Sequence, residues 1–217
     1  LTGTEAERIA LTTGGASGVP MWKELARMSG TTAENKSYLE TATFTAKPFL
    51  MILMQGSSTT GEEYDLLFNA DTGGNYTNRQ STNGGSDGQG SFSKIRIGGS
   101  GGSGSRGNFN YAYFNNVASS EKIGTIHGVW GATGTGGGIT RTEVVGKWTN
   151  TSDQITSVRF GHENRSFNGV GGSELVVLGY DPADTTAGSG FWEELASVSG
   201  DGSSTTLTTG TFTAKKY

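Results

Sequence analysis

The sequence predicts an all-β protein, an antiparallel β-sandwich of the jelly-roll or concanavalin (lectin-like) type with about eleven strands. Glycine is abundant, with 37 residues against 3 prolines, which suits short strands joined by many tight turns. Several segments alternate large apolar residues with polar ones, which is the period of a strand with one buried face. Many short strands cannot leave a bare apolar face in water, so we expect two packed sheets.

Individual segments support this fold in chain order. Residues 92–97 and 155–160 alternate strictly, so each is expected to present one face to a core. Residues 49–54 are apolar on both faces, which predicts a central strand covered on both sides or one beneath a long loop. Residues 22–28 include helix formers, but the same motif recurs near the C-terminus without a cap, so we expect a strand there. The expected strands are 22–28, 38–45, 49–55, 63–68, 76–81, 91–97, 109–114, 122–130, 140–148, 155–160 and 174–180.

Large apolar residues on and beside these strands are expected to fill the core, while three glycine-rich stretches, 83–90, 98–107 and 131–138, are expected to be loops. The expected core residues are Phe44, Leu50, Ile52, Leu66, Phe68, Ile95, Ile97, Val144, Trp148, Ile155, Val158, Val176 and Leu178.

One stretch of the chain occurs twice. Residues 21–30 and 191–200 share Trp, Glu, Leu, Ala, Ser and Gly at equivalent positions, 170 residues apart. Residues 43–47 and 211–215 are both Thr-Phe-Thr-Ala-Lys, at a spacing shorter by two residues. Self-similarity at a fixed spacing is typical of repeat architectures, so we expect a tandem repeat with a period of about 170 residues.

The repeat divides the chain into one complete domain and two fragments. A weaker likeness between residues 7–11 and 174–178 places the end of a preceding repeat at the N-terminus. We therefore expect a terminal strand plus linker in 1–20, a complete β-sandwich in 21–181, a linker in 182–190, and the first two strands of the next repeat in 191–217.

Two strands alone are marginal, which predicts that neighbouring units complete each other. Either the natural chain continues, or another chain supplies the missing strands by β-augmentation. Head-to-tail contacts of this kind make an open filament. The residues expected to carry the assembly are Trp22, Trp192, Leu195, Leu207, Phe212, Ile9 and Leu11.

Composition and charge exclude several partners. The net charge of -4 and the isoelectric point near 5.2 give no long-range attraction for nucleic acid or an anionic membrane surface. The most apolar run, residues 49–54, is too short to insert across a bilayer. The chain has no cysteine, which excludes a disulfide framework and thiol catalysis.

We expect no cofactor, with calcium as the one alternative. Asn69, Asp71 and Asn75 surround a glycine pair and could ring a Ca²⁺ ion with oxygen ligands. The competing interpretation is a hairpin turn in which Asp71 and Asn75 bond their own backbone. A single carboxylate favours the turn, because Ca²⁺ prefers several charges among its oxygen ligands.

Catalytic signals are sparse. The two histidines, His127 and His162, do not have a metal-binding spacing, and no carboxylate pair of the glycosidase kind stands out. We therefore expect no enzyme, and a glycoside hydrolase or lyase is the last of the alternatives. A different alternative is a sugar-binding platform formed by Trp130, Tyr111 and Tyr113, with burial in the core or in a subunit contact as the competing interpretation.

Three segments, residues 64–76, 145–156 and 172–181, resemble a recurrent β-sandwich module of structural proteins of phages and environmental viruses, of the tail-fibre or virion-decoration type. Similar modules occur in repetitive microbial surface proteins. The resemblance implies a place in fibres, virion decorations or surface appendages, and it carries over no active-site residue.

We therefore expect a non-enzymatic structural repeat unit of an extracellular fibre or filament, located outside the cell or on a virion surface and self-associating head to tail. The alternative is a glycan- or receptor-binding adhesion module with a cell-surface glycan as its partner.

Overall fold

The structure is a computed structural model that describes residues 22–30, 38–58, 63–99, 106–132, 134–135, 138–162, 172–184, 198, 206 and 208–214. The expected terminal strand and linker in 1–20, and most of the expected segments in 182–190 and 191–217, lie outside the described residues.

All regular secondary structure in the described ranges is β-strand, so the expected all-β class is confirmed. Residues 22–28, for which a helix was the competing possibility, form a strand. The strands are β1 (Lys23–Ser29), β2 (Tyr38–Glu40), β3 (Phe49–Ser58), β4 (Glu63–Phe68), β5 (Tyr76–Thr82), β6 (Gly88–Phe92), β7 (Ile95–Gly99), β8 (Arg106–Asn115), β9 (Lys122–Ala132), β10 (Ile139–Trp148), β11 (Val158–Gly161) and β12 (Glu174–Tyr180).

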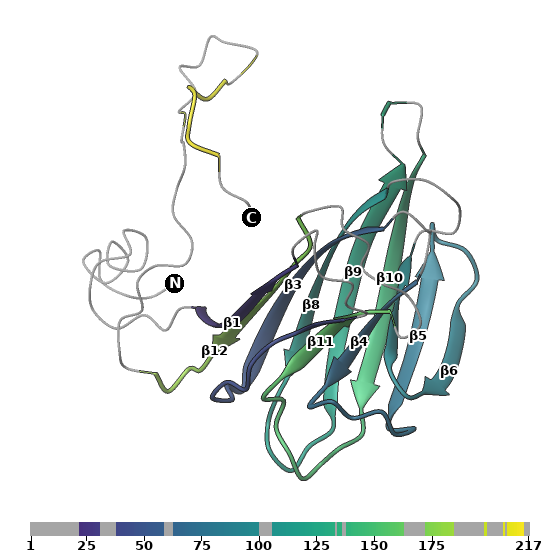
Figure 1. Cartoon of the computed structure of the whole chain (residues 1–217), viewed down its shortest axis with the longest axis vertical. Helices are drawn as coiled ribbons and strands as arrows, with labels where there is room; N and C mark the ends of the chain where they lie inside the picture. Colours follow the sequence, from purple (N-terminus) through teal and green to yellow (C-terminus); the bar gives the residue numbers. More distant parts are fainter. Residues whose placement is uncertain are drawn as a thin grey trace, which may run out of the picture.

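The strands form two antiparallel sheets. The larger sheet has eight strands in the order β1-β12-β3-β8-β9-β10-β5-β6, so β1 and β6 are its edges (Figure 1). The smaller sheet has four strands in the order β2-β11-β4-β7. Consecutive segments of the chain cross between the sheets several times, which brings the two ends of the described domain, β1 and β12, side by side at one edge.

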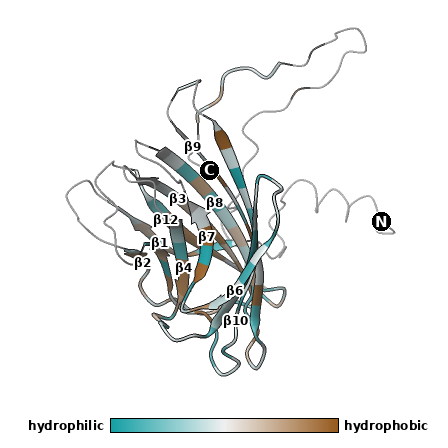
Figure 2. Ribbon diagram, turned by 90° about the vertical axis from the view of Figure 1, so that its right-hand side faces the viewer, coloured by the Kyte–Doolittle hydropathy of each residue, from teal (hydrophilic) through white to brown (hydrophobic). Residues whose placement is uncertain are grey.

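One apolar core lies between the two sheets. Side chains alternate between the faces of each strand, and hydrophilic and hydrophobic residues alternate visibly along the ribbons (Figure 2). Residues from both sheets meet in the core, as in Ile52 of β3 and Leu66 of β4. Every residue that the sequence assigned to the core is buried. Val176 and Leu178, however, belong to a second cluster on the opposite, outer face of the eight-stranded sheet.

The expected single strand over residues 91–97 is wrong. Phe92 ends β6, which pairs with β5 in the larger sheet, whereas Ile95 begins β7, which pairs with β4 in the smaller sheet. The chain bends between them, and the Arg96 guanidinium stacks over the Phe92 ring at 4.5 Å. Lys94 forms an ion pair with the buried Asp65 at 3.0 Å. The expected single strand is therefore two strands in different sheets, joined by a bend at residues 93 and 94. With this division the described residues contain twelve strands.

The strand expected over 155–160 begins later, at Val158, because side chains and isolated backbone groups, and not a regular strand ladder, hold the chain before it. The Asn69 carboxamide oxygen accepts hydrogen bonds from the backbone N–H groups of Thr156, at 2.8 Å, and Ser157, at 3.1 Å. The buried Asn116 accepts from the Ile155 N–H at 2.6 Å. The strand expected over 38–45 is likewise shorter and ends at Glu40.

The turn between β4 and β5 is tied to the core by Trp148. The Trp148 indole N–H donates to the Asp71 carboxylate at 2.7 Å, and the same carboxylate accepts from the Gly73 N–H at 2.8 Å and the Asn75 amide at 3.0 Å. The side-chain oxygen of Asn69 instead accepts hydrogen bonds from the N–H groups of residues 156 and 157. The three calcium candidates therefore do not direct their oxygens at one point. This geometry is that of a hydrogen-bonded turn.

Acid is expected to weaken this turn. Burial alone would raise the pKa of Asp71, but hydrogen bonds from Trp148, Asn75 and Gly73 outweigh it and lower that pKa. A carboxyl with a lower pKa in the folded state stabilises the protein above its unfolded pKa, near 4, and this contribution is lost as the pH falls through the folded pKa. We therefore expect Asp71→Asn to lower the free energy of unfolding by about 1 kcal/mol at pH 7, and by less at a pH acidic enough to protonate the folded carboxyl.

Urea denaturation followed by circular dichroism at both pH values measures this difference. Asp87→Asn is the matched control, because Asp87 is an exposed carboxylate paired with Arg79 at 3.1 Å, and it should change the free energy by only about 0.3 kcal/mol. A deficit for Asp71→Asn that stays constant between the two pH values would show that the charge of Asp71 does not stabilise the turn.

Candidate functional site

The outer face of the eight-stranded sheet carries a continuous group of aromatic side chains, here called the aromatic face. It lies over β12, β3 and β8, next to the edge strand β1. Beneath the rings lie four aliphatic or thioether side chains that are buried although they face away from the main core: Met51, Leu53, Val176 and Leu178. The rings are those of Trp22, Phe49, Phe109, Tyr111, Tyr113 and Tyr180.

Strand parity and register place these residues on one face. In β3 the even-numbered residues 50, 52 and 54 enter the main core, so the odd-numbered residues face outward. The register pairs Met51 with Tyr113 and Leu53 with Tyr111. On the other side, Leu178 pairs with Met51. Residues 50–54 thus belong to a central strand with buried side chains on both faces, as expected, whereas Phe49 at its start is 40% exposed.

The rings contact one another in a chain. Trp22 lies between Tyr180, at a centroid distance of 5.7 Å, and Tyr113, at 6.2 Å with an interplanar angle of 63°. Tyr113 meets Tyr111 edge to face at 6.0 Å, and Tyr111 stacks on His127 at 5.5 Å. Edge-to-face and offset contacts at these distances are favourable beyond the area they bury, so the rings form one ordered surface.

A hollow of about 380 Å³ opens between Trp22, Phe49, Tyr113 and Tyr180. Phe49 and Tyr113 are 40% and 41% exposed, which is unusual for large rings that already have partners. Among the lining residues the one amide side chain is Asn115, and it is already engaged: it donates to the Glu121 carbonyl at 3.1 Å and accepts from the Ile123 N–H. The hollow therefore favours an apolar occupant.

The edge strand β1 is fixed to β12 by ion pairs as well as by its ladder. Arg27 pairs with Glu24 of its own strand at 2.6 Å and with Glu174 of β12, whose side chain is only 4% exposed. At the other end of the strand Lys23 pairs with Asp184 at 3.2 Å. In these two pairs the residues of β12 and just beyond it, Glu174 and Asp184, are acidic, whereas their partners in β1 are basic.

The pKa values of Arg27 and Asp184 shift in the directions expected of ion-paired groups. The hydrogen bond to Glu24 raises the pKa of Arg27, and Glu174 raises it further against the effect of burial. Hydrogen bonds from Lys47 and then from Lys23 lower the pKa of Asp184. The Arg27 guanidinium and the Asp184 carboxylate are therefore charged at neutral pH.

The three residues expected to form a sugar platform lie on opposite faces of the sheet. Tyr111 and Tyr113 are on the outer, aromatic face of β8. Trp130 has the parity of Ile126, which lies in the main core, so it points to the inner face of β9. Trp22, which the sequence suggested for assembly, takes the place beside Tyr113. Phe49 and Tyr180 were not singled out from the sequence. Their positions at the ends of apolar runs are the signal that could have placed them with the other rings.

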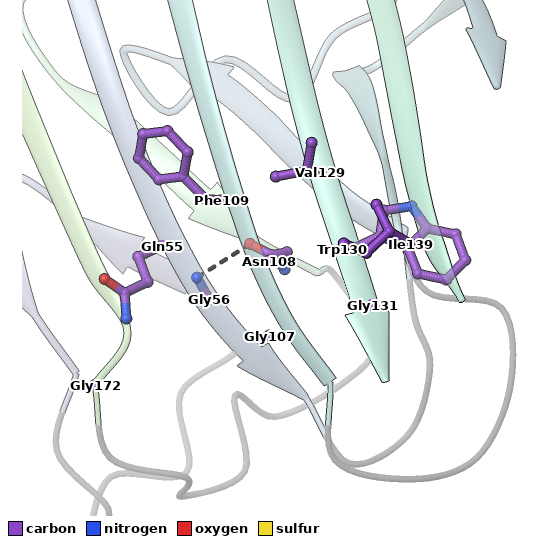
Figure 3. Close-up of a pocket in the computed structure, with 10 residues that line it drawn as sticks. All are labelled: Gln55, Gly56, Gly107, Asn108, Phe109, Val129, Trp130, Gly131, Ile139 and Gly172. Carbon is purple, nitrogen blue, oxygen red and sulfur yellow. Dashed lines mark hydrogen bonds between the residues drawn. The ribbon is translucent and has the colours of Figure 1, made fainter. Parts of the chain in front are cut away.

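Trp130 instead lines a second hollow, of about 550 Å³, at the ends of β3, β8, β9 and β10. Figure 3 shows Gly56 at the end of β3 joined to Asn108 of β8 by a hydrogen bond, with Trp130 on the neighbouring strand. Asn108 accepts from the Gly56 N–H at 3.0 Å and from the Asn110 amide at 3.2 Å. Its carboxamide oxygen thus stabilises the strand ends.

Of the residues expected to carry assembly, Trp22 lies on the aromatic face and Phe212 is 49% exposed. The other five, Trp192, Leu195, Leu207, Ile9 and Leu11, lie outside the described residues.

In the part of the chain that the structure describes, no three histidine, cysteine, aspartate or glutamate side chains gather in a way that could hold a metal ion. Nor is there, among the same residues, a helix with the length and hydrophobicity needed to cross a membrane.

Comparison of the chain with known protein families, with curated proteins and with solved structures gave no match.

Proposed function

We propose that the chain is a non-enzymatic structural unit of an extracellular fibre or filament, of the kind found in viral fibres or microbial surface appendages, and that its units associate head to tail. The observation that carries the proposal is that β1, the edge strand beside the aromatic face, is the element whose sequence occurs a second time, at residues 191–200. A tandem repeat of about 170 residues and a jelly-roll or lectin-like topology belong to this proposal.

The aromatic face supports self-association. Three apolar side chains on the outer surface of β9 and β10, Ile123, Val129 and Val145, are each about half exposed, although polar residues such as His127 and Lys147 lie between them. Contiguous apolar patches on a soluble domain mark interaction sites, and tyrosine, tryptophan and phenylalanine are the residues enriched at the cores of protein interfaces. We propose a second copy of the chain as the partner, which meets the aromatic face with a different part of its own surface, because a head-to-tail contact joins two different patches.

Replacing Phe49 with lysine is expected to weaken self-association about thirtyfold, because a buried aromatic anchor contributes about 2 kcal/mol to an interface. Phe49 borders the hollow of the aromatic face and is 40% exposed, so the change should leave the fold intact. Sedimentation velocity over a concentration series measures the effect.

Ile139→Lys is the matched control. Ile139 is 81% exposed and starts β10 at the opposite end of the same outer face, beside Val129 and Phe109, so it tests whether the association depends on the Phe49 end of that face. It should leave the association constant within about threefold of the wild type. Equal weakening by both variants would mean that general surface charge, and not the aromatic face, governs the association.

A glycan- or receptor-binding module is the second candidate, and the row of rings on β8 is the observation that favours it. Tyr111 and Tyr113 are accessible from the outer face, and aromatic rings stack on sugars. Binding to a glycan array that is lost in Tyr113→Ala, in a chain that stays monomeric, would favour this candidate over the fibre.

A further inference from the structure

The edge of β12 receives β1 through a defined set of positions. In the ladder Lys23 faces Gly179, Glu24 faces Leu178 and Arg27 faces Val176, with an irregularity between residues 24 and 26. Leu25, Ala26 and Met28 pack against the main core. The edge therefore requires apolar residues at three positions of the incoming strand and accepts polar residues at the others.

A second segment of the same chain satisfies the apolar requirement. Aligned on the two tryptophans, residues 192–199 have Leu195, Ala196 and Val198 where β1 has Leu25, Ala26 and Met28. Glu194 corresponds to Glu24 and Ser199 to Ser29 in the same alignment. By shape and hydrophobicity, residues 193–199 would fit the ladder beside β12.

The two segments differ in charge at the two positions where β1 forms ion pairs with β12 and its end. Lys23, which pairs with Asp184, is replaced by Glu193. Arg27, which pairs with the nearly buried Glu174, is replaced by Ser197. Asp184 also pairs with Lys47 at 2.8 Å, so Glu193 would remove one of the two cations of Asp184 and add a like charge beside it. Ser197 would remove the Arg27 guanidinium from Glu174. Like charges in contact and the loss of a partner for a desolvated carboxylate both oppose binding.

We propose that the edge of β12 is a strand-receiving site in which Glu174 and Asp184 select the 23–29 sequence and reject the otherwise matching segment 193–199 of the same or of a neighbouring chain. The inference rests on the proposed function, in which such segments begin successive units. Rejection prevents one unit from capturing the first strand of the next, and so keeps the units in order.

Disulfide trapping tests which segment occupies the edge, because the chain has no native cysteine. Glu24 and Leu178 are direct ladder partners, so Glu24→Cys with Leu178→Cys reports β1, and Glu194→Cys with Leu178→Cys reports residues 193–199. In the native charge background we expect the first pair to oxidise and the second to give less than about a tenth of that yield. A disulfide within one chain migrates as a monomer, and one between chains as a dimer.

The charge-exchanged background carries Lys23→Glu, Arg27→Ser, Glu193→Lys and Ser197→Arg. There the second pair should oxidise at least about tenfold better than in the native background, and the first pair less well. Equal yields of the second pair in the two backgrounds would overturn the proposal. If the exchange unfolds the domain, Glu193→Lys with Ser197→Arg on native β1 should still raise the second yield, and no rise would overturn it as well.

The trapping result is independent of whether the native chain forms filaments. A wild type that stays monomeric contradicts the proposed function, yet the disulfide within each monomer still reports which segment β12 receives.

Discussion

Trp148→Ala is expected to lower the free energy of unfolding by about 3–5 kcal/mol, as a large-to-small change in a packed core. Trp148 is fully buried. It stacks on Tyr76 at a centroid distance of 6.4 Å and contacts Phe68 at 6.0 Å. Its indole N–H also donates to Asp71, so the substitution removes both core volume and the anchor of the turn between β4 and β5.

Urea denaturation followed by circular dichroism measures this loss. Trp148→Phe is the companion variant, because it keeps most of the ring but cannot donate to Asp71, and it should cost about half as much. A loss below about 1 kcal/mol for Trp148→Ala would contradict a core centred on this residue.

Asn116→Ala is expected to lower the free energy of unfolding by about 3 kcal/mol. Asn116 is completely buried, and its amide donates to the carbonyl groups of Lys47 at 3.0 Å and Ile155 at 3.1 Å. Its oxygen accepts from the Ile155 N–H at 2.6 Å. Alanine leaves these backbone groups without their partner in the interior, and each such group costs about 1–3 kcal/mol.

Asn150→Ala is the control for Asn116→Ala, measured by the same denaturation experiment. Asn150 makes a similar set of local bonds, to the N–H groups of Ser152 and Asp153, but in an exposed turn. Water replaces those bonds, so the loss should be no more than about 1 kcal/mol. If the two asparagine variants were equally destabilised, burial would not be the reason for the importance of Asn116.

Much of the fold could be predicted from the sequence because most strands bury one face of an alternating pattern. The segment 140–148, for example, places Val144 and Trp148 in the core by parity alone. The all-apolar segment 49–54 likewise indicated a strand covered on both sides, and the two clusters of buried residues cover it.

The predictions failed where individual contacts, and not a regular strand ladder, determine the path of the chain. Periodicity does not distinguish a strand from two short strands in different sheets, so the bend after Phe92 was missed. Residues 154–157 have the alternation of a strand, but they form hydrogen bonds with Asn69 and Asn116, which lie in turns far away in the sequence. Lys122 is buried with its ammonium donating to the carbonyls of Ser120, at 2.8 Å, and Asn150, at 3.0 Å, and no sequence signal predicts such a lysine.

The candidate site was predicted in part. Tyr111, Tyr113 and Trp22 were singled out separately, but the register that joins them to Tyr180 depends on pairing between strands far apart in the sequence. The placement of Trp130 on the inner face follows from the same register. The sequence repeat drew attention to β1, while the ion pair of Arg27 with Glu174 depends on pairing between the two ends of the domain.

Sedimentation velocity of the unmodified chain over a wide concentration series tests the central claim most directly, namely that units of this protein associate through the edge strand and the aromatic face beside it. An open head-to-tail assembly predicts a mass distribution that keeps growing with concentration and has no closed end point. A single monomeric species at every concentration, up to hundreds of micromolar, would contradict the account.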